Sequence, residues 1–309
     1  MNLQKARKTF LKDGIGGLMF DIIIYFIMLL ILLVTLYPFL NMVAVSFNDA
    51  LDSLLGGIGM WPRKFTLYNY EFIFENRSII QATITSVLRT VVGATLNLAV
   101  CMMLAYSLSR KEFICRFIFL KILVFTMYIS GGLIPVFLLM RFLGLTGTFW
   151  VYIIPGAVSA WNVVIIRSYV ENSIPDSLIE SARIDGATEF RTLFAIVFPL
   201  SMPVIATVLL WNAVGQWNSW FDVMLYNNTK PNLSTLQYEL QKVLMQTIQT
   251  AQVYNTAQLS SEMAARRQTT TAQATRAAMT IVATLPVLLV YPFLQKYFIH
   301  GLTIGGVKE

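Results

Sequence analysis

Six long runs of apolar residues, separated by polar segments, set the pattern of this chain. A helix needs about 20 apolar residues to cross the hydrocarbon core of a bilayer, which is about 30 Å thick. Each run reaches that length, so each predicts one membrane-spanning helix. The runs cover residues 22–46, 80–108, 117–140, 149–169, 195–220 and 276–298.

Composition supports the same fold class. The 309 residues are 56% hydrophobic and 13% charged, and the mean hydropathy is +0.64. Soluble domains carry roughly 25% charged residues, so a soluble fold with half that share could not cover its surface. The same values exclude a disordered chain, a disulfide scaffold and a coiled coil. We therefore predict an all-α polytopic membrane protein with six transmembrane helices, in which residues 22–298 form one membrane domain.

The basic residues predict which side of the membrane each polar segment faces, because cytoplasmic loops carry an excess of Lys and Arg. By this rule the N-terminal tail 1–21, the segment 171–194 and the C-terminal tail 299–309 are cytoplasmic, and 48–79 and 222–275 are external loops. The cations that decide this are Lys5, Arg7, Lys8, Lys12, Arg110, Lys111, Arg116, Arg167, Arg183 and Arg191, against Arg141 in the short link on the other side.

The net charge of +7 could indicate nucleic-acid binding, but the 23 Lys and Arg are scattered rather than striped. We attribute the charge to membrane topology and predict no nucleic-acid partner. The basic tail before the first run resembles the start of a signal peptide, but the apolar core is too long for one. We expect the first run to remain as a membrane anchor.

Residues that carry chemistry are few. His300 is the single histidine, and two cysteines, Cys101 and Cys115, are too few for a disulfide framework or a metal site. The sequence has no Walker-type GxxxxGK[ST] loop for a nucleotide. We therefore predict no catalytic residue, no metal ligands and no cofactor in this chain.

Acidic residues bear on the main alternative function, an ion-coupled secondary solute transporter. Such transporters place carboxylates within the bilayer. Here Asp21, Glu180 and Asp222 all lie at or outside the ends of the predicted spans, which argues against ion coupling. A membrane enzyme would need a catalytic cluster that one histidine does not provide.

The segment 171–194 has the features of a short helix on the cytoplasmic face. Ser173 with Asp176 fits a capping box, and Pro175 suits the first helical turn. Gly186 is placed to stop the helix in the left-handed conformation. The small residues Ser181 and Ala182 would leave a surface that another protein can approach closely.

A motif with long, specific spacing overlaps this helix. Glu180-Ser181-Ala182 is followed after three residues by Gly186 and, nine residues later, by Ile196-Val197-Phe198-Pro199. This resembles the EAA signature of bacterial ABC importer permeases, with Ser181 in place of an alanine and Phe198 in place of a leucine. Residues 130–135, 213–222 and 284–308 resemble the carbohydrate branch of that family, of the maltose-permease type. The similarity is narrower still to the second permease of oligosaccharide importers of the LplC/YtcP kind.

The resemblance implies a type I ABC importer permease in a bacterial cell membrane, with a set of partners. These are a second homologous permease, two cytoplasmic ATPase subunits that bind ATP and Mg, and an extracytoplasmic sugar-binding lipoprotein that delivers an oligosaccharide. In the family, the helix around Glu180 sits in a cleft on an ATPase subunit. The residues it would assign to ATPase coupling are Glu180, Ser181, Ala182, Asp185, Gly186 and Pro199.

The fifth run offers a candidate substrate pathway. Asn212 and Gln216 lie four residues apart on one helix face, and with Trp217 and Asn218 they combine aromatic and hydrogen-bonding groups, as sugar sites do. Polar groups at this depth avoid lipid, so they face either the pore or another helix, and the sequence does not choose. Gly131 and Gly132 interrupt the third run, which suits either a cavity lining or a packing kink.

Two further features have open interpretations. Arg89 lies in the second run, where a mid-bilayer arginine costs about 2.5–3.5 kcal/mol. We expect it to extend outward to the interface, the alternative being an ion pair with a carboxylate such as Asp222. The Gln/Thr/Ala-rich stretch 247–273 resembles in position a loop that contacts the binding protein, although a solvated helix explains it equally well.

Overall fold

The computed structural model of the chain describes residues 14–254 and 271–304. The cations Lys5, Arg7, Lys8 and Lys12, most of the 247–273 stretch and the last five residues lie outside the described residues. Within the described part the chain is helical, and its one β-bridge is an isolated pair, Asn48 with Phe65. The predicted all-α class is confirmed.

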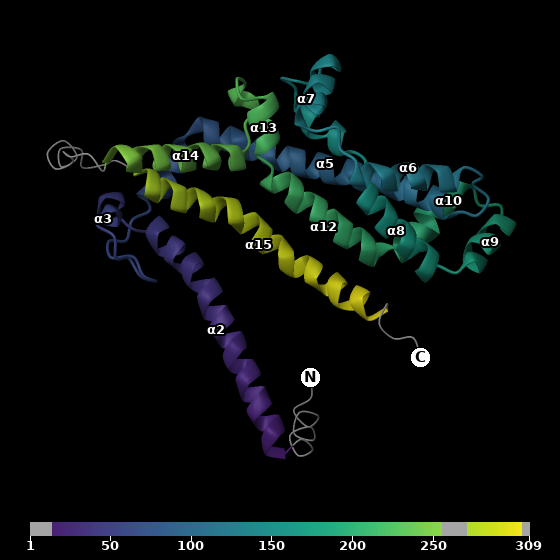
Figure 1. The fold of residues 1–309 in the computed structure, drawn as a ribbon, viewed down its shortest axis with the longest axis horizontal. Coiled ribbons are helices and arrows are strands. Elements are labelled where there is room, and N and C mark those ends of the chain that lie inside the picture. The colour runs from purple at the N-terminus through teal and green to yellow at the C-terminus, as the bar shows by residue number, and fades with distance from the viewer. Residues whose placement is uncertain (1–13, 255–270, 305–309) are drawn as a thin grey trace. The chain divides into compact units, whose positions relative to one another are not determined.

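The elements follow the apolar pattern of the chain (Figure 1). In order they are α2 (Gly14–Ser46), α3 (Ala50–Leu54), α4 (Tyr68–Glu75), α5 (Arg77–Ser109), α6 (Arg116–Tyr128), α7 (Leu133–Phe142), η1 (Phe149–Tyr152), η2 (Ile154–Gly156), α8 (Ala160–Ser173), α9 (Asp176–Ile184), α10 (Glu189–Thr192), the π-helical η3 (Leu193–Val197), α11 (Phe198–Leu200), α12 (Met202–Asn218), α13 (Phe221–Tyr226), η4 (Pro231–Leu233), α14 (Leu236–Tyr254) and α15 (Ala272–Ile304).

Three continuous helices in the described residues are long and apolar enough to cross a bilayer: Met19–Ser46, Arg77–Ser109 and Gln273–Val290. The other three predicted spans are each divided into a bent pair. The bends are 119° between α6 and α7, 46° before α8, and 84° between α11 and α12. The count therefore reaches six when each bent pair is taken as one span, and six spans remains a prediction.

The chain divides into two compact units. The first contains Met1–Ile73 and Thr250–Ile281, and the second contains Phe74–Gln249 and Val282–Glu309. In the first unit, the segment that follows α2 folds around the amide of Asn69, which donates to the carbonyls of Ser46 and Asn48 at 3.0 and 2.9 Å. The short helix expected near Tyr68 is present as α4.

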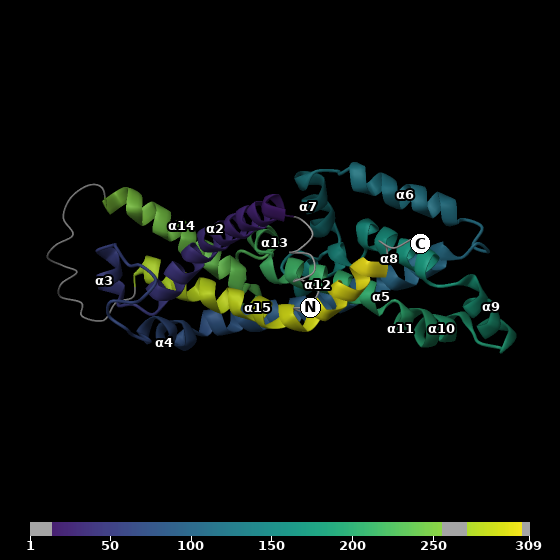
Figure 2. The ribbon, with the colours of Figure 1, turned by 90° about the horizontal axis from the view of Figure 1, so that it is seen from below.

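The second unit is organised around α5, which packs along α8 and α12 (Figures 1 and 2). One face of α5 carries a buried residue at every fourth position, namely Arg89, Gly93, Asn97, Cys101 and Ala105. Small residues on such a face let neighbouring helices approach closely. The apolar core extends from this face to the end of α5 and includes Tyr106, Leu108, Val163 and Ile179.

Candidate functional site

The predicted coupling helix exists as α9, and one face of it is buried in the second unit. Ile179 is 1% exposed and packs in the same apolar core as Tyr106 and Leu108. Glu180 and Ser181 are exposed, whereas Ala182 is buried by the chain itself. The surface open to another protein therefore includes Ser181 but not the Ala182 methyl group, which corrects the expectation that both are open.

The C-terminal end of α9 is as predicted. Gly186 has a φ of +77°, the left-handed region that glycine adopts without steric cost. The Ala187 N–H donates to the Ala182 carbonyl at 2.9 Å, and the Gly186 N–H donates to the Arg183 carbonyl at 3.0 Å. This pair of bonds is the Schellman motif, so Gly186 ends the helix.

The prediction of a capping box at the N-terminal end of α9 is wrong. Ser173 is the last residue of α8, Pro175 occupies the N-cap position, and no side chain caps the helix there. Asp176 instead accepts a hydrogen bond from the Lys111 ammonium at 2.8 Å, and Arg110 lies 3.7 Å from the same carboxylate. Ser173 cannot act as a cap because it still belongs to α8. The Asp176 carboxylate is bound by Lys111, from the link between α5 and α6.

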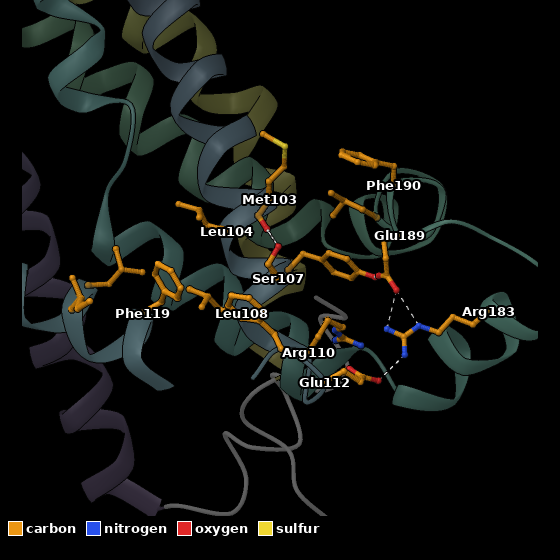
Figure 3. Close-up of a pocket in the computed structure, with 15 residues that line it drawn as sticks. Met103, Leu104, Ser107, Leu108, Arg110, Glu112, Phe119, Arg183, Glu189 and Phe190 are labelled. Atoms are coloured by element: carbon orange, nitrogen blue, oxygen red, sulfur yellow. Dashed lines mark hydrogen bonds and ion pairs between the residues drawn. The ribbon is translucent and has the colours of Figure 1, made fainter. Parts of the chain in front are cut away.

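A second set of charges surrounds Arg183, as Figure 3 shows. Its guanidinium lies between two carboxylates, 2.6 Å from Glu112 and 2.9 Å from Glu189. The Tyr106 hydroxyl donates to the other oxygen of Glu189 at 2.6 Å. We call Tyr106, Glu112, Arg183 and Glu189 the Arg183 cluster; it joins α5, the link after it, α9 and α10.

Electrostatics in this region favour the charged forms. The Arg183 guanidinium holds the pKa of the Glu112 carboxyl below its ordinary value, and Lys111 does the same for the pKa of Asp176. Both carboxylates are more than half exposed, so solvent screens these interactions. Beside the cluster lies a cavity of about 680 Å³ with a mainly apolar lining, to which Met103, Leu104 and Phe119 contribute (Figure 3).

Two predicted coupling residues, Glu180 and Asp185, have exposed carboxylates that form no close contact within the described residues, although the charge of Glu180 acts on Lys111 at longer range. Neither side chain makes an ion pair or a hydrogen bond there, and both are exposed. Pro199 lies exposed in α11, two residues before the break at Ser201 where the chain bends into α12. The structure thus presents Glu180, Ser181 and Asp185 on an open surface, and the coupling role of these residues remains a prediction.

The candidate substrate residues of α12 mostly contact other helices. Asn162 donates to Asn97 at 3.0 Å and to Asn212 at 3.4 Å, which links α5, α8 and α12. Trp217 is buried, and its indole N–H donates to the Ala283 carbonyl of α15 at 2.8 Å. Asn218 is exposed and accepts from Gln237 at 3.1 Å.

Gln216 belongs to a buried polar cluster with Arg89. Nε and one terminal nitrogen of Arg89 both donate to the side-chain oxygen Oε1 of Gln216, at 3.1 and 3.0 Å. The other groups around the guanidinium are the Asp222 carboxylate at 2.5 Å, the Ser219 backbone carbonyl at 3.3 Å and the Tyr152 ring, whose centroid is 4.5 Å away. We call Arg89, Tyr152, Gln216 and Asp222 the Arg89 cluster.

The expectation that Arg89 extends to the interface is wrong. Its side chain is 2% exposed, and the alternative, a pair with Asp222, is what the structure shows. A buried arginine is tolerated when its donors are satisfied by an anion and by further hydrogen bonds, and here they are. Because Gly93 lacks a side chain, Gln216 fits against α5, where a Cβ would come within 2.8 Å of the Gln216 amide.

The third run breaks at the predicted glycines. Gly132 has a φ of +83° and is the N-cap residue of α7, and the chain turns by 119° between α6 and α7. Gly131 and Gly132 are exposed in this chain. The break is thus real, and its part in a substrate pathway stays a prediction.

Sequence reasoning missed the Arg183 and Arg89 clusters as units. Glu112 and Glu189 drew no attention, although both lie in links that the positive-inside rule places on the same side as Arg183. That shared side is the signal that could have suggested a pairing. It does not select among several acids and bases, since the pairing depends on which helix ends pack together.

Membrane-spanning helices joined to an exposed, capped helix that bears the EAA spacing define a transport permease. Residues 98–304 match the family described as the binding-protein-dependent transport system inner membrane component. The chain belongs to this family, and it is a multi-pass membrane subunit of a transport system rather than an enzyme. The predicted membership of this permease family is confirmed.

Two relatives from Bacillus subtilis (strain 168) are each 36% identical to this chain. One is the polygalacturonan/rhamnogalacturonan transport system permease protein YtcP, with 94% of this chain and 98% of the relative covered. The other is the protein LplC, with 89% and 90% covered. A crystal structure of a bacterial ABC transporter involved in the import of the acidic polysaccharide alginate has a similar chain, with 27% identity, a TM-score of 0.81, and 92% and 98% of the two chains covered. The type I importer permease fold is therefore confirmed.

Proposed function

We propose that this chain is one of two permease subunits of an ATP-driven importer that translocates an oligosaccharide. The observation that carries the proposal is the open face of α9, where Glu180 lies exposed at the EAA spacing and makes no ion pair or hydrogen bond with the described residues. Support for a carbohydrate comes from the relatives, since YtcP is named for polygalacturonan and rhamnogalacturonan and the solved transporter for alginate.

The proposed assembly contains a second homologous permease, two ATPase subunits that hold ATP and Mg, and an extracytoplasmic sugar-binding lipoprotein. A chain with no nucleotide loop needs an external source of free energy, and a docked helix can transmit a rigid-body movement. Both termini are proposed to be cytoplasmic, on the side of α9. Long apolar side chains along α2 from Met19 to Tyr37 are exposed, which suits contact with lipid or the second permease.

In this proposal α9 sits on an ATPase subunit through Glu180, Ser181 and Asp185. A carboxylate at the docked face can pair with a basic group of the ATPase, and Ser181 is small enough for close approach. Gly186 sets the direction in which the chain leaves the helix. The stop at Gly186 therefore fixes the orientation of the docked face relative to α10.

The substrate path is proposed to run along the exposed end of α12 near Asn218 and along the Gly131–Gly132 break. Three of the candidate residues are hydrogen-bonded within the chain: Asn212 to Asn162, Gln216 to Arg89, and Trp217 to the Ala283 carbonyl. These bonds favour the helix-contact role over direct sugar binding for those three residues. A sugar ring would then find its main partners at the chain's surface or on the second permease.

The test is a mild-detergent pull-down of the tagged chain from native membranes, with Glu180→Ala and Gly186→Asp variants. The expected wild-type eluate contains an ATPase, a second permease and a sugar-binding protein, and hydrolyses ATP faster with oligosaccharide. Each variant should insert normally but lose oligosaccharide uptake, while Glu75→Ala, an exposed acid on α4, should not. A lone chain without ATPase activity would overturn the proposal and favour an ion-coupled secondary transporter.

A further inference from the structure

Helix α9 is tied to the link between α5 and α6 at both of its ends. At its first residue, Asp176 pairs with Lys111 at 2.8 Å. Next to its last residue, Arg183 pairs with Glu112 at 2.6 Å. The two partners, Lys111 and Glu112, are neighbours in the sequence and lie just after the end of α5.

The Arg183 end of this contact reaches two more elements. Arg183 also pairs with Glu189 on α10, and Glu189 accepts the Tyr106 hydroxyl from the last turns of α5. Figure 3 shows the guanidinium between the two carboxylates, with the dashed lines of the ion pairs on either side. Beneath the charges, Ile179 is buried in the core that also contains Tyr106. The charges and the core therefore hold α9 to α5.

Two ion pairs, one near each end of α9, restrict the orientation of the helix, whereas a single pair would restrict only its position. An exposed ion pair alone stabilises a fold by about 0–1 kcal/mol, so neither pair is a strong bond. The nine residues of α9 extend about 13 Å at 1.5 Å per residue, so contacts at the two ends fix its direction as well as its position. With Ile179 between them in the core, α9 has little freedom to pivot on α5.

The covalent route from α9 to the membrane is less direct. After Gly186 the chain passes through α10, the π-helix η3 and α11, and then bends by 84° before α12 begins. A π-helical turn and a sharp bend can absorb a small displacement. The ion pairs, in contrast, connect α9 to residues that directly follow a continuous 33-residue helix, α5, which packs along both α8 and α12.

We propose that Arg183 is a positioning residue that, with Glu112, makes α9 and α5 move as one body. This inference rests on the proposed function, because the movement is the one that an ATPase subunit would impose on α9. The Arg183–Glu112 pair stays closed through the transport cycle. It passes the displacement of α9 straight to α5, without the route through η3 and the bend.

The experiment is a charge swap in the importer purified with its partner subunits and placed in liposomes. All variants carry Glu189→Gln, which can still accept the Tyr106 hydroxyl and removes the carboxylate that an acid at position 183 would face. The variants are Glu112→Arg, Arg183→Glu and both together, with Arg191→Glu as a charge-reversal control on α10. ATP hydrolysis and oligosaccharide import are measured separately, and their ratio is the readout.

We expect each single reversal to lower import per ATP by about tenfold while hydrolysis continues, and the double reversal to recover most of the loss, because the pair is coupled. The Arg191 reversal should leave the ratio unchanged. Single reversals with an unchanged ratio, or a folded double variant with no recovery, would overturn the inference. A wild-type preparation that contains no ATPase would instead overturn the proposed function, so the two failures are distinguishable.

A second measurement asks whether the pair must open. Glu112→Cys and Arg183→Cys are introduced together in a Cys115→Ser background, since Cys101 is buried and Cys115 is exposed. A flexible bis-maleimide then joins the two thiols. Both substitutions remove the ion pair, so the uncross-linked variant should have a low ratio of import to ATP hydrolysis. If α9 and α5 move as one body, the cross-link replaces the pair and should raise that ratio. A ratio that the cross-link leaves unchanged or lowers, with no effect of the same reagent on either single cysteine, would contradict the proposal.

Discussion

The Arg89 and Arg183 clusters both connect α5 to other elements of the chain, at two different places along that helix. Each uses one arginine to bind more than one acceptor, and at least one carboxylate comes from a segment distant in the sequence, Asp222 for Arg89 and Glu112 for Arg183. The two arginines differ in their exposure: the Arg89 side chain is 2% exposed, whereas that of Arg183 is 34% exposed and its partner Glu112 is 63% exposed. Arg89 lies 17 residues before Tyr106, about 25 Å along the helix.

The difference in exposure determines how much each cluster contributes to the stability of the fold. Breaking a buried ion pair leaves an uncompensated charge in a low-dielectric setting, so the Arg89 cluster is costly to change. An exposed pair stabilises a fold by only about 0–1 kcal/mol, so the Arg183 cluster contributes direction rather than stability. Fixed packing suits the Arg89 region, and a surface that meets a partner suits the Arg183 region.

The largest effect is expected for Asp222→Ala, which leaves the buried Arg89 without its anion. The free energy of unfolding should fall by about 3–5 kcal/mol. Unfolding of the purified chain by SDS, followed by circular dichroism, measures this change. The double variant Arg89→Met with Asp222→Ala is the control and should lose less than the single variant. A single variant as stable as wild type would remove the energetic contrast between the clusters.

Gly93→Ala should weaken the same cluster indirectly. Its Cβ would come within 2.8 Å of the Gln216 amide, so Gln216 must leave its place beside Arg89. We expect a loss of about 1–3 kcal/mol in the free energy of unfolding, the range for overpacking. Gly215→Ala is the matched control, because it lies in α12 with open space around it. That change should be neutral or stabilising by up to about 1 kcal/mol. Equal effects of the two substitutions would show that Gly93 is not a packing site.

Arg183→Gln should change the free energy of unfolding by less than about 1 kcal/mol, in contrast with Asp222→Ala. The same SDS titration measures it, at low salt and again at about 1 M salt, where the Debye length falls to about 3 Å. The small effect of Arg183→Gln should vanish at high salt, while the Asp222→Ala loss should persist. A large, salt-independent loss in Arg183→Gln would mean that the exposed cluster is structural after all.

The smallest effect concerns pH at Glu112. Its pKa is lowered from an ordinary value of 4.5, chiefly by the Arg183 guanidinium. The stabilisation by the carboxylate is therefore present above about pH 4.5 and is lost as pH falls through the lower folded-state pKa. The difference in thermal unfolding midpoint between wild type and Glu112→Gln should be constant from about pH 8 to pH 5 and shrink below about pH 4. A difference that shrinks already near pH 6 would contradict this assignment.

Local features of the chain were predicted well from the sequence. Apolar runs of spanning length became helices because burial of backbone polar groups in lipid leaves a helix as the available solution. Gly186 stopped α9 as expected, since a positive φ is set by the residue and its neighbours in sequence. The EAA spacing pointed to the family correctly, and residues 98–304 match its model.

Features that depend on contacts with residues distant in the sequence were predicted poorly. The sequence near Ser173 fits a capping box, but α8 continues through Ser173 and Lys111 takes the Asp176 carboxylate. Arg89 was expected to reach the interface, and the pair with Asp222, 133 residues away, holds it inside. In both cases the local pattern was sound, and an ion pair with a distant residue gave the lower free energy.

Apolar periodicity, glycine stops and motif spacing are properties of neighbouring residues, so the amino-acid order was enough to identify a helical membrane permease and to locate its α9 segment. Which acid meets which base was decided when α5, α8 and α12 packed together. Several carboxylates were available to Arg89 and Arg183. Only packing brought Asp222 to the first and both Glu112 and Glu189 to the second, because ion pairing acts over a few ångströms and sequence distance does not measure that separation.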